Sequence, residues 1–226
     1  MKLIIGAQKE EINAIISLFS EYKEDKINDF PYYKGKINDQ DCILVQGGIG
    51  AASTVMLVTL FSTLADIEYV INVGTAGGVN NKNLKVTDVV VSNSLAYYDA
   101  DVTFFNYKYG QMAGCPRSFK ADEKLINKIL EINPNIRKGD MLSGDKFIVD
   151  KHHPMEHITK NFSDLDILTV DMESCAVANA CYLLKIPFVI LRVVSDIIES
   201  HDQGKTYEEV LQISGQVAAE IINKLI

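Results

Sequence analysis

Acidic side chains follow several apolar runs of this 226-residue sequence, where a general acid or base could act. Glu11 comes soon after the apolar run at residues 2–7, Asp171 and Glu173 follow residues 165–170, and Asp196 follows residues 187–195. Carboxylates in clefts transfer protons or stabilise a developing cation. Each acid alone could instead be a solvated helix residue or a helix cap. Their repeated placement after apolar runs is therefore more informative than any single one.

Glycine-rich segments occupy similar places, with GGIG at residues 47–50 and GTAGG at residues 74–78. We expect both to be turns that follow strands. Neither matches the GxGxxG dinucleotide fingerprint, and no GxSxG elbow indicates a serine nucleophile. His152, His153 and His157 hint at a metal, but their spacing is not HExxH. We expect a solvated helix there, no metal site and no cofactor.

Apolar runs that alternate with helical patterns must position these groups. Residues 9–19, 51–64, 122–132, 154–162, 173–184 and 207–225 are predicted helices. Predicted strands lie at residues 2–7, 69–74, 86–98, around 140–144, at 165–170 and 187–195, and in a hairpin of residues 32–37 and 41–46. Several strands are apolar on both faces, which indicates helices on both sides of the sheet. We predict one domain over residues 1–226, a three-layer α/β/α sandwich with a central mixed, twisted sheet. Residues 99–119 show no clear period, and such long irregular segments are often functional.

The composition excludes several classes of function. A net charge of −8 disfavours nucleic-acid partners, which need a basic face. No apolar run reaches the length of a membrane span, and the N-terminus does not resemble a signal peptide. The four cysteines lack CxxC spacing, so we expect reduced thiols and a cytoplasmic protein.

One family carries all of these segments in the same order. The sequence resembles bacterial 5'-methylthioadenosine/S-adenosylhomocysteine nucleosidases, in the purine nucleoside phosphorylase superfamily, from residue 1 to about residue 210. The resemblance rests on GAQKEE, GGIG, NVGTAGGV, YYDADVTFFNYKYGQMAGCP, SGDKFI, VDMES and RVVSD. It implies a nucleoside phosphorylase/hydrolase-like fold and an enzyme that hydrolyses the N-glycosidic bond of an adenine nucleoside.

The resemblance also implies roles for single residues. Asp196 would protonate N7 of adenine, Glu11 would activate water with help from Arg192 and Thr75, and Glu173 would hold the ribose hydroxyls and stabilise the oxocarbenium-like sugar. Phe147 would stack on the base, the backbone of Ile148 would bind its edge, and Met172 would pack beneath the ribose. Asp171 stands where the family usually has Glu, and we interpret it as structural. The full set of expected substrate-binding residues is Gln8, Ile49, Thr75, Ala76, Gly77, Val102, Phe105, Tyr107, Ala113, Lys146, Phe147, Ile148, Asp171, Met172, Glu173, Arg192, Ser195 and Tyr207.

An apolar pocket for the 5' substituent is implied as well, with Phe105 and Ala113 reaching it from a partner subunit. A homodimer is therefore expected, with residues 99–119 as an active-site lid. Three residues depart from the family here: Gln8 replaces Met, Ala113 replaces Pro and Tyr207 replaces Phe. The preference among methylthioadenosine, S-adenosylhomocysteine and 5'-deoxyadenosine stays open.

Asn72 favours hydrolysis over phosphorolysis. Phosphorylases of the superfamily have an arginine at this place to hold phosphate, whereas this chain has Asn72 and an acid-rich first loop. Without cations the site does not compensate a phosphate dianion. A phosphorylase, or a nucleosidase for another purine nucleoside such as a futalosine-type compound, remains the nearer alternative. A nucleoside sensor without catalysis is the more distant one.

Overall fold

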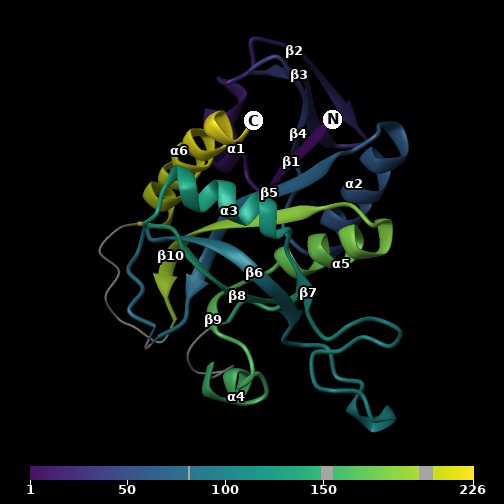
Figure 1. Ribbon diagram of the computed structural model, residues 1–226, viewed down its shortest axis with the longest axis vertical. Coiled ribbons are helices and arrows are strands. Elements are labelled where there is room, and N and C mark those ends of the chain that lie inside the picture. Colours follow the sequence, from purple (N-terminus) through teal and green to yellow (C-terminus); the bar gives the residue numbers. More distant parts are fainter. Residues whose placement is uncertain (81, 149–154, 199–205) are drawn as a thin grey trace.

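A mixed β-sheet flanked by helices forms the core of the chain (Figure 1), in a computed structural model that describes residues 1–80, 82–148, 155–198 and 206–226. The strands are β1 (Lys2–Gly6), β2 (Glu21–Ile27), β3 (Phe30–Ile37), β4 (Gln40–Gln46), β5 (Tyr69–Gly78), β6 (Val89–Tyr97), β7 (Phe119–Lys120), β8 (Arg137–Ser143), β9 (Ile167–Asp171) and β10 (Phe188–Ile197). The helices are α1 (Lys9–Ile16), α2 (Ala51–Leu64), the short η1 (Thr103–Phe105), α3 (Glu123–Ile132), α4 (Met155–Lys160), α5 (Ser174–Leu184) and α6 (Tyr207–Leu225).

The strand order is β10-β6-β8-β9-β5-β1-β4-β3-β2, and β10 also pairs with β5. This extra pairing closes five strands into a ring, from which β1, β4, β3 and β2 extend. Parallel pairs such as β1–β5 and β5–β10 occur beside antiparallel pairs such as β5–β9 and β6–β10. The sheet is therefore mixed, as predicted.

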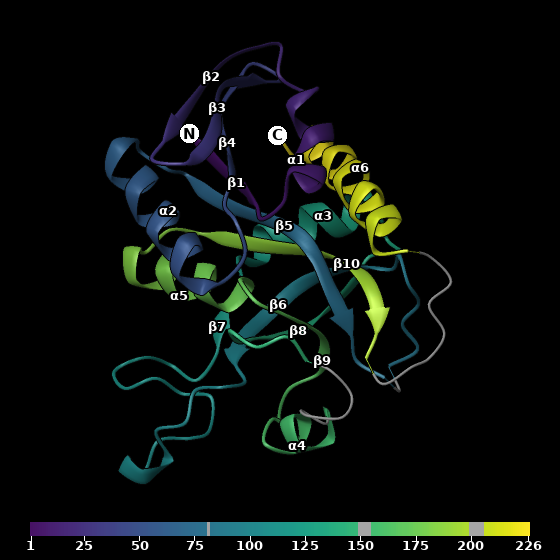
Figure 2. The same cartoon turned by 180° about the vertical axis from the view of Figure 1, so that it is seen from behind.

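Helices cover both faces of the sheet. Helices α1, α3 and α6 pack together on one side, and α2 and α5 lie side by side on the other (Figures 1 and 2). The predicted three-layer arrangement is confirmed. Helix α3 turns a narrow apolar stripe inward, formed by Leu125, Ile126 and Ile129.

Helix ends follow local sequence signals. Helix α6 begins after Thr206, whose hydroxyl accepts a hydrogen bond from the backbone N–H of Glu209 at 3.3 Å. Asp122 accepts from Leu125 N at 3.0 Å and starts α3 in the same way. Such caps satisfy amide groups that have no partner within the helix. They fix where each helix starts.

The structure differs from the predicted elements in several places. The GTAGG segment is not a turn, because β5 continues through Gly78 and pairs there with β9 and β10. A charged strand, β2, was not predicted at all. Helix α1 ends at Ile16 rather than residue 19.

The histidine cluster lies largely outside the described residues, since His152, His153 and the side chain of His157 fall in the undescribed parts. The described residues contain no group of three or more metal-binding side chains. None of the helices in the described ranges has the length and apolar character to cross a bilayer.

Candidate active site

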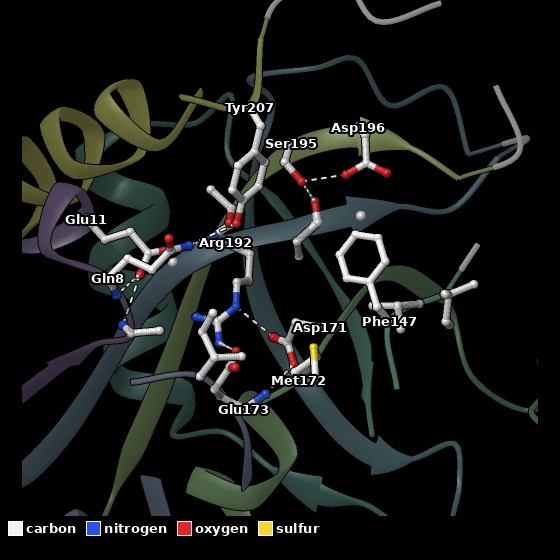
Figure 3. Close-up of a pocket in the computed structure, with 18 of the residues that line it drawn as sticks. Gln8, Glu11, Phe147, Asp171, Met172, Glu173, Arg192, Ser195, Asp196 and Tyr207 are labelled. Carbon is white, nitrogen blue, oxygen red and sulfur yellow. Dashed lines mark hydrogen bonds and ion pairs between the residues drawn. The ribbon is translucent and has the colours of Figure 1, made fainter. Parts of the chain in front are cut away.

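A pocket opens where the carboxyl ends of β1, β5, β9 and β10 meet the first turn of α1, the residues that precede α2 and α5, and the first residue of α6 (Figure 3). Its volume is about 780 Å³, including the solvent-filled space at its mouth. Strand ends of an α/β sheet are a common place for ligands. The predicted residues that line it are Gln8, Glu11, Ile49, Thr75, Ala76, Gly77, Lys146, Phe147, Ile148, Asp171, Met172, Glu173, Arg192, Ser195, Asp196 and Tyr207.

Glu11 lies on the first turn of α1 with only 2% of its surface exposed. One carboxylate oxygen accepts hydrogen bonds from the backbone N–H groups of Ala7 and Gln8, both at 2.9 Å. The other oxygen accepts from Thr75 N at 3.1 Å. Burial raises the pKa of Glu11, against these bonds and the charge of Arg192. The result is a buried carboxyl, held by three backbone donors, whose proton affinity is increased.

Glu173 is the residue before α5 and approaches the pocket from β9. Its Oε1 accepts a hydrogen bond from Gly50 N, at the start of α2, over 2.8 Å. Burial, and then the neighbouring charge of Asp171, raises the pKa of Glu173 to about 7, although Arg192 and the Gly50 amide oppose this. A carboxyl poised near neutral pH responds strongly to a nearby positive charge.

Arg192 is the buried cation beneath these acids, with 1% of its surface exposed. It donates from Nε to Asp171 Oδ2 at 2.7 Å and from Nη2 to Asn72 Oδ1 at 2.6 Å. Its Nη2 lies 4.0 Å from Glu173 Oε2. Arg192, which also lines the pocket, therefore neutralises part of the acid cluster.

Asp171, at the end of β9, accepts hydrogen bonds from residues of β8, α5 and β10. Besides Arg192, its carboxylate accepts from the hydroxyls of Ser143 at 2.5 Å and Ser174 at 2.9 Å. It also accepts from Ser174 N at 3.0 Å, and so caps α5. These contacts agree with the structural interpretation of Asp171, whose oxygens are committed to the protein.

Asp196 lies across the pocket from Glu11, near the end of β10 (Figure 3). It is half-buried, and Ser195 donates its hydroxyl to Asp196 Oδ1 at 2.6 Å. The register of β10 against β5 shifts between Val194 and Asp196. A bulge of this kind redirects side chains at a strand end. Here Ser195 and Asp196 are consecutive residues that both line the pocket.

A loop of residues 144–148 forms the wall beside Asp196. Phe147 is 69% exposed, with its ring at the cavity (Figure 3). Tyr98 donates its hydroxyl to the carbonyl of Lys146, and Asp99 accepts from Asp145 N at 2.9 Å. Asp145 Oδ1 in turn accepts from Ala51 N at 3.0 Å. The loop is thus tied both to β6 and to the start of α2.

Gln8 and Tyr207 form a polar contact at the rim of the pocket. Gln8 Nε2 donates to the Tyr207 hydroxyl at 2.9 Å, joining the start of α1 to the start of α6. Tyr207 is 47% exposed. Two residues predicted as separate members of an apolar subsite are therefore bonded to each other.

Comparison with known proteins gives these features a context. A model of the phosphorylase superfamily matches residues 2–226. The chain is 36% identical to a Borrelia burgdorferi protein assigned as a 5'-methylthioadenosine/S-adenosylhomocysteine nucleosidase, solved bound to adenine, with a TM-score of 0.90 and coverage of 100% of this chain and 98% of that chain. It is 31% identical to the Streptococcus pneumoniae nucleosidase in complex with 8-aminoadenine, with a TM-score of 0.90 and coverage of 99% and 97%. The Streptococcus pyogenes S-adenosylhomocysteine nucleosidase in complex with 5-methylthiotubericidin is also 31% identical, at a TM-score of 0.90 and coverage of 100% and 95%.

The chain belongs to the 5'-methylthioadenosine/S-adenosylhomocysteine nucleosidases of the phosphorylase superfamily. Asn72 has a structural place in this nucleosidase. It is buried, donates to the carbonyl of Ile5 at 2.9 Å and holds Arg192 from below. The side-chain amide of Asn72 thus orients the buried guanidinium of Arg192.

Four predicted residues of the nucleosidase do not line the pocket within the described part of this chain: Val102, Phe105, Tyr107 and Ala113. They lie on the segment that protrudes beyond β6 and carries η1 (Figure 2). Phe105 is 67% exposed and its neighbour Phe104 is 90% exposed. The expected roles of Phe105 and Ala113 depend on a second subunit.

Sequence reasoning missed Ala7, Val73, Gly74, Val170 and Ile198, which also line the pocket. Each is within two residues of a predicted site residue. The sequence did contain a signal for these five residues, because the backbone next to a site residue at a strand end also forms the wall of the pocket. A Cβ atom at Gly74 would lie 3.1 Å from Glu11 Oε1, so a side chain would fit only tightly against this wall.

Proposed function

We propose that the chain hydrolyses the N-glycosidic bond of 5'-methylthioadenosine and S-adenosylhomocysteine, and also that of 5'-deoxyadenosine. Water adds to C1' of the ribose, the bond from C1' to N9 breaks, and its electron pair stays with adenine. The products are adenine and the 5-substituted ribose. The convergence of Glu11, Glu173 and Asp196 on one pocket carries this proposal.

Glu11 is proposed to take the proton of the attacking water. Its three backbone donors hold the carboxylate in one orientation, and Arg192 keeps a positive charge nearby. Burial raises its pKa, which brings its basicity closer to the working pH. General bases act best when their pKa lies near that pH. Thr75 supports Glu11 through its backbone N–H rather than through its hydroxyl.

Glu173 is proposed to stabilise the cationic sugar. With a pKa of about 7, this carboxyl is partly protonated at neutral pH. Positive charge developing on the ribose favours the ionised form. The attraction is then stronger in the transition state than in the ground state, which is the condition for catalysis.

Asp196 is proposed to donate the proton that lets adenine leave as a neutral base. Its Oδ1 is occupied by Ser195, which leaves Oδ2 to carry the proton toward N7. Phe147 stands beside it with an exposed ring suited to stacking on a purine. The backbone of Ile148 supplies groups for the base edge.

We further propose a homodimer in which Phe105 and Ala113 enter the partner's pocket. Apolar side chains gather on three neighbouring surfaces: Met56 and Leu64 on α2, Leu183 on α5, and Phe104 and Phe105 on the protruding segment. Exposed apolar patches of this kind are typical of protein interfaces. The protruding segment that carries Phe104 and Phe105 would also reach the pocket of the partner subunit.

A cytoplasmic location is proposed from the thiols. All four cysteines are free, and Cys42, Cys175 and Cys181 are buried. Unpaired thiols are typical of proteins in reducing compartments.

The decisive test is to follow release of the free base, each with and without phosphate: adenine from methylthioadenosine, S-adenosylhomocysteine and 5'-deoxyadenosine, and hypoxanthine from inosine. We expect adenine from the first three in phosphate-free buffer. Strict dependence on phosphate would replace the hydrolase by a phosphorylase. Tight binding of the nucleosides without turnover would indicate a sensor.

A further inference from the structure

The hydrogen bond between Gln8 and Tyr207 marks a polar end of the pocket. Gln8 is the residue before α1 and is half-buried, whereas Tyr207 opens α6 and is 47% exposed. Gln8 Nε2 and the Tyr207 hydroxyl are 2.9 Å apart, and both residues line the cavity. In Figure 3 the hydroxyl end of the Tyr207 ring is turned toward Gln8.

The position of this pair relative to the acids decides what it can contact. Phe147 and Asp196 lie on one side of the cavity, and Gln8 lies on the other beside Glu11 (Figure 3). If the base is held at Asp196 and the ribose over Glu173, as the proposed function requires, the remaining part of the nucleoside is the 5' substituent. That substituent leaves the sugar toward Gln8 and Tyr207, at the solvent edge.

The chemistry of the pair suits a substituent with hydrogen-bonding groups. The Tyr207 hydroxyl accepts the bond from Gln8 and still has its own proton to donate. Gln8 holds the Tyr207 hydroxyl in place through its side chain. The backbone of Gln8 is itself held, because its N–H donates to Glu11 Oε2 at 2.9 Å. Because Tyr207 is half in solvent, a charged group bound there keeps much of its hydration.

We propose that the Gln8–Tyr207 pair selects substrates whose 5' substituent ends in a polar, charged tail. The homocysteinyl group carries a carboxylate that can accept a hydrogen bond from the Tyr207 hydroxyl, whereas a methylthio group or a 5'-methyl group offers no such acceptor. The pair is therefore a specificity determinant that favours S-adenosylhomocysteine over methylthioadenosine and 5'-deoxyadenosine. This inference rests on the proposed function.

The test is to measure kcat/KM for S-adenosylhomocysteine and methylthioadenosine with Tyr207→Phe, Gln8→Met and the double variant. Tyr207→Phe removes only the hydroxyl and is expected to lower kcat/KM for S-adenosylhomocysteine at least about tenfold, the size of one hydrogen bond to a charged group. The value for methylthioadenosine is expected to change less than about twofold. Gln8→Met should act in the same direction, and the double variant should lose little more than Tyr207→Phe alone, because the two side chains act as a unit.

Tyr22→Phe is the matched control, since Tyr22 is 48% exposed and lies on β2 away from the pocket. Its substrate ratio should stay that of the unmodified enzyme. Equal losses with both substrates, or no change in the ratio, would overturn the proposed selection and leave the pair with a structural role. A failure of the proposed function is distinct, because the unmodified enzyme would then release adenine from neither substrate.

Discussion

Glu11 and Glu173 are two buried acids that are stabilised in different ways. Three backbone N–H groups bind Glu11, whereas Glu173 has one backbone donor and a more distant guanidinium. Hydrogen bonds to an ionised carboxylate offset the cost of burying its charge. Removing the charge should therefore have different effects at the two sites.

Glu11→Gln is expected to lower kcat at least about a hundredfold, because the amide cannot accept the proton of water. The variant should remain folded, although one of the three backbone donors would then face an NH2 group. Steady-state rates of adenine release, together with a melting curve, check this. Glu10→Gln changes an exposed acid one residue away and should leave the rate unaltered. A folded Glu11→Gln variant with near-normal turnover would remove Glu11 from the proposed mechanism.

Glu173→Gln is expected to lower kcat at least about a hundredfold and to stabilise the fold, most strongly at alkaline pH. The pKa of Glu173 is raised from 4.5 to about 7, so between these values the folded state binds a proton that the unfolded chain has released. The resulting penalty is absent below about pH 4.5 and complete above about pH 7, where it costs on the order of 1–3 kcal/mol.

Calorimetry at pH 5 and pH 8 measures this difference. The variant should gain more in melting temperature at pH 8 than at pH 5, relative to the unmodified protein. An equal gain at both values, or a larger one at pH 5, would contradict the raised pKa.

At this scale much of the site followed from the sequence, because the acids come directly after apolar runs that had to become strands. What could not be predicted is how Glu173 is held. Its hydrogen-bond partner, Gly50, is 123 residues away, and no local pattern specifies such a contact. Likewise, the glutamate pattern at residues 10 and 11 does not reveal which of the two acids is buried.

Helices α1 and α6 together place Glu11. They approach closely at Gly215, where a Cβ atom would come within 2.4 Å of the carbonyl oxygen of Glu10 and 3.2 Å of that of Glu11. A glycine in a helix interior costs stability unless close packing requires it. Here the close approach sets the position of the first turn of α1 and hence of its carboxylate.

Gly215→Ala is expected to destabilise the fold by about 1–3 kcal/mol, because the added methyl group overpacks the helix contact. It should also reduce kcat, since α1 has to move away and take Glu11 with it. Gln216→Ala, an exposed change on the same helix, should do neither. Urea unfolding and rate measurements on both variants check this. Full activity in Gly215→Ala would show that Glu11 tolerates displacement of its helix.

Elements with strong periodic or apolar patterns were predicted well. The bounds of α2 and α6 agree with prediction at both ends, because each has a clear local start signal and a continuous pattern. The GTAGG segment was misassigned since glycines usually indicate turns. In the structure they extend β5 between β10 and β9, where side chains at Gly77 or Gly78 would meet neighbouring residues within 2.9 Å.

On the scale of the whole molecule, the pocket and the protruding segment are separate within one chain. The proposed dimer brings Phe105 of each subunit to the pocket of the other. An active site shared in this way can be assembled from two defective subunits.

Coexpression of Glu11→Gln and Phe105→Ala subunits tests this arrangement. Each homodimer is expected to be impaired, whereas a mixed dimer has one pocket with an intact Glu11 and an intact Phe105. A random mixture should recover about a quarter of normal activity, because half of the dimers are mixed and each has one intact pocket. Light scattering should give the mass of a dimer. Activity no higher than the average of the two homodimers would place Phe105 outside the shared site.

The outermost strand of the sheet has a consequence for this assembly. Strand β2, with sequence EYKEDKI, is exposed along nearly its whole length and lies at the free end of the strand order. A strand from another molecule that paired there would have to strip water from lysine, glutamate and aspartate side chains, which is unfavourable. Since the other end of the sheet is closed by the pairing of β10 with β5, growth of the sheet from molecule to molecule is blocked. The proposed dimer would therefore form through the apolar helices and the protruding segment, not by extension of the sheet at β2.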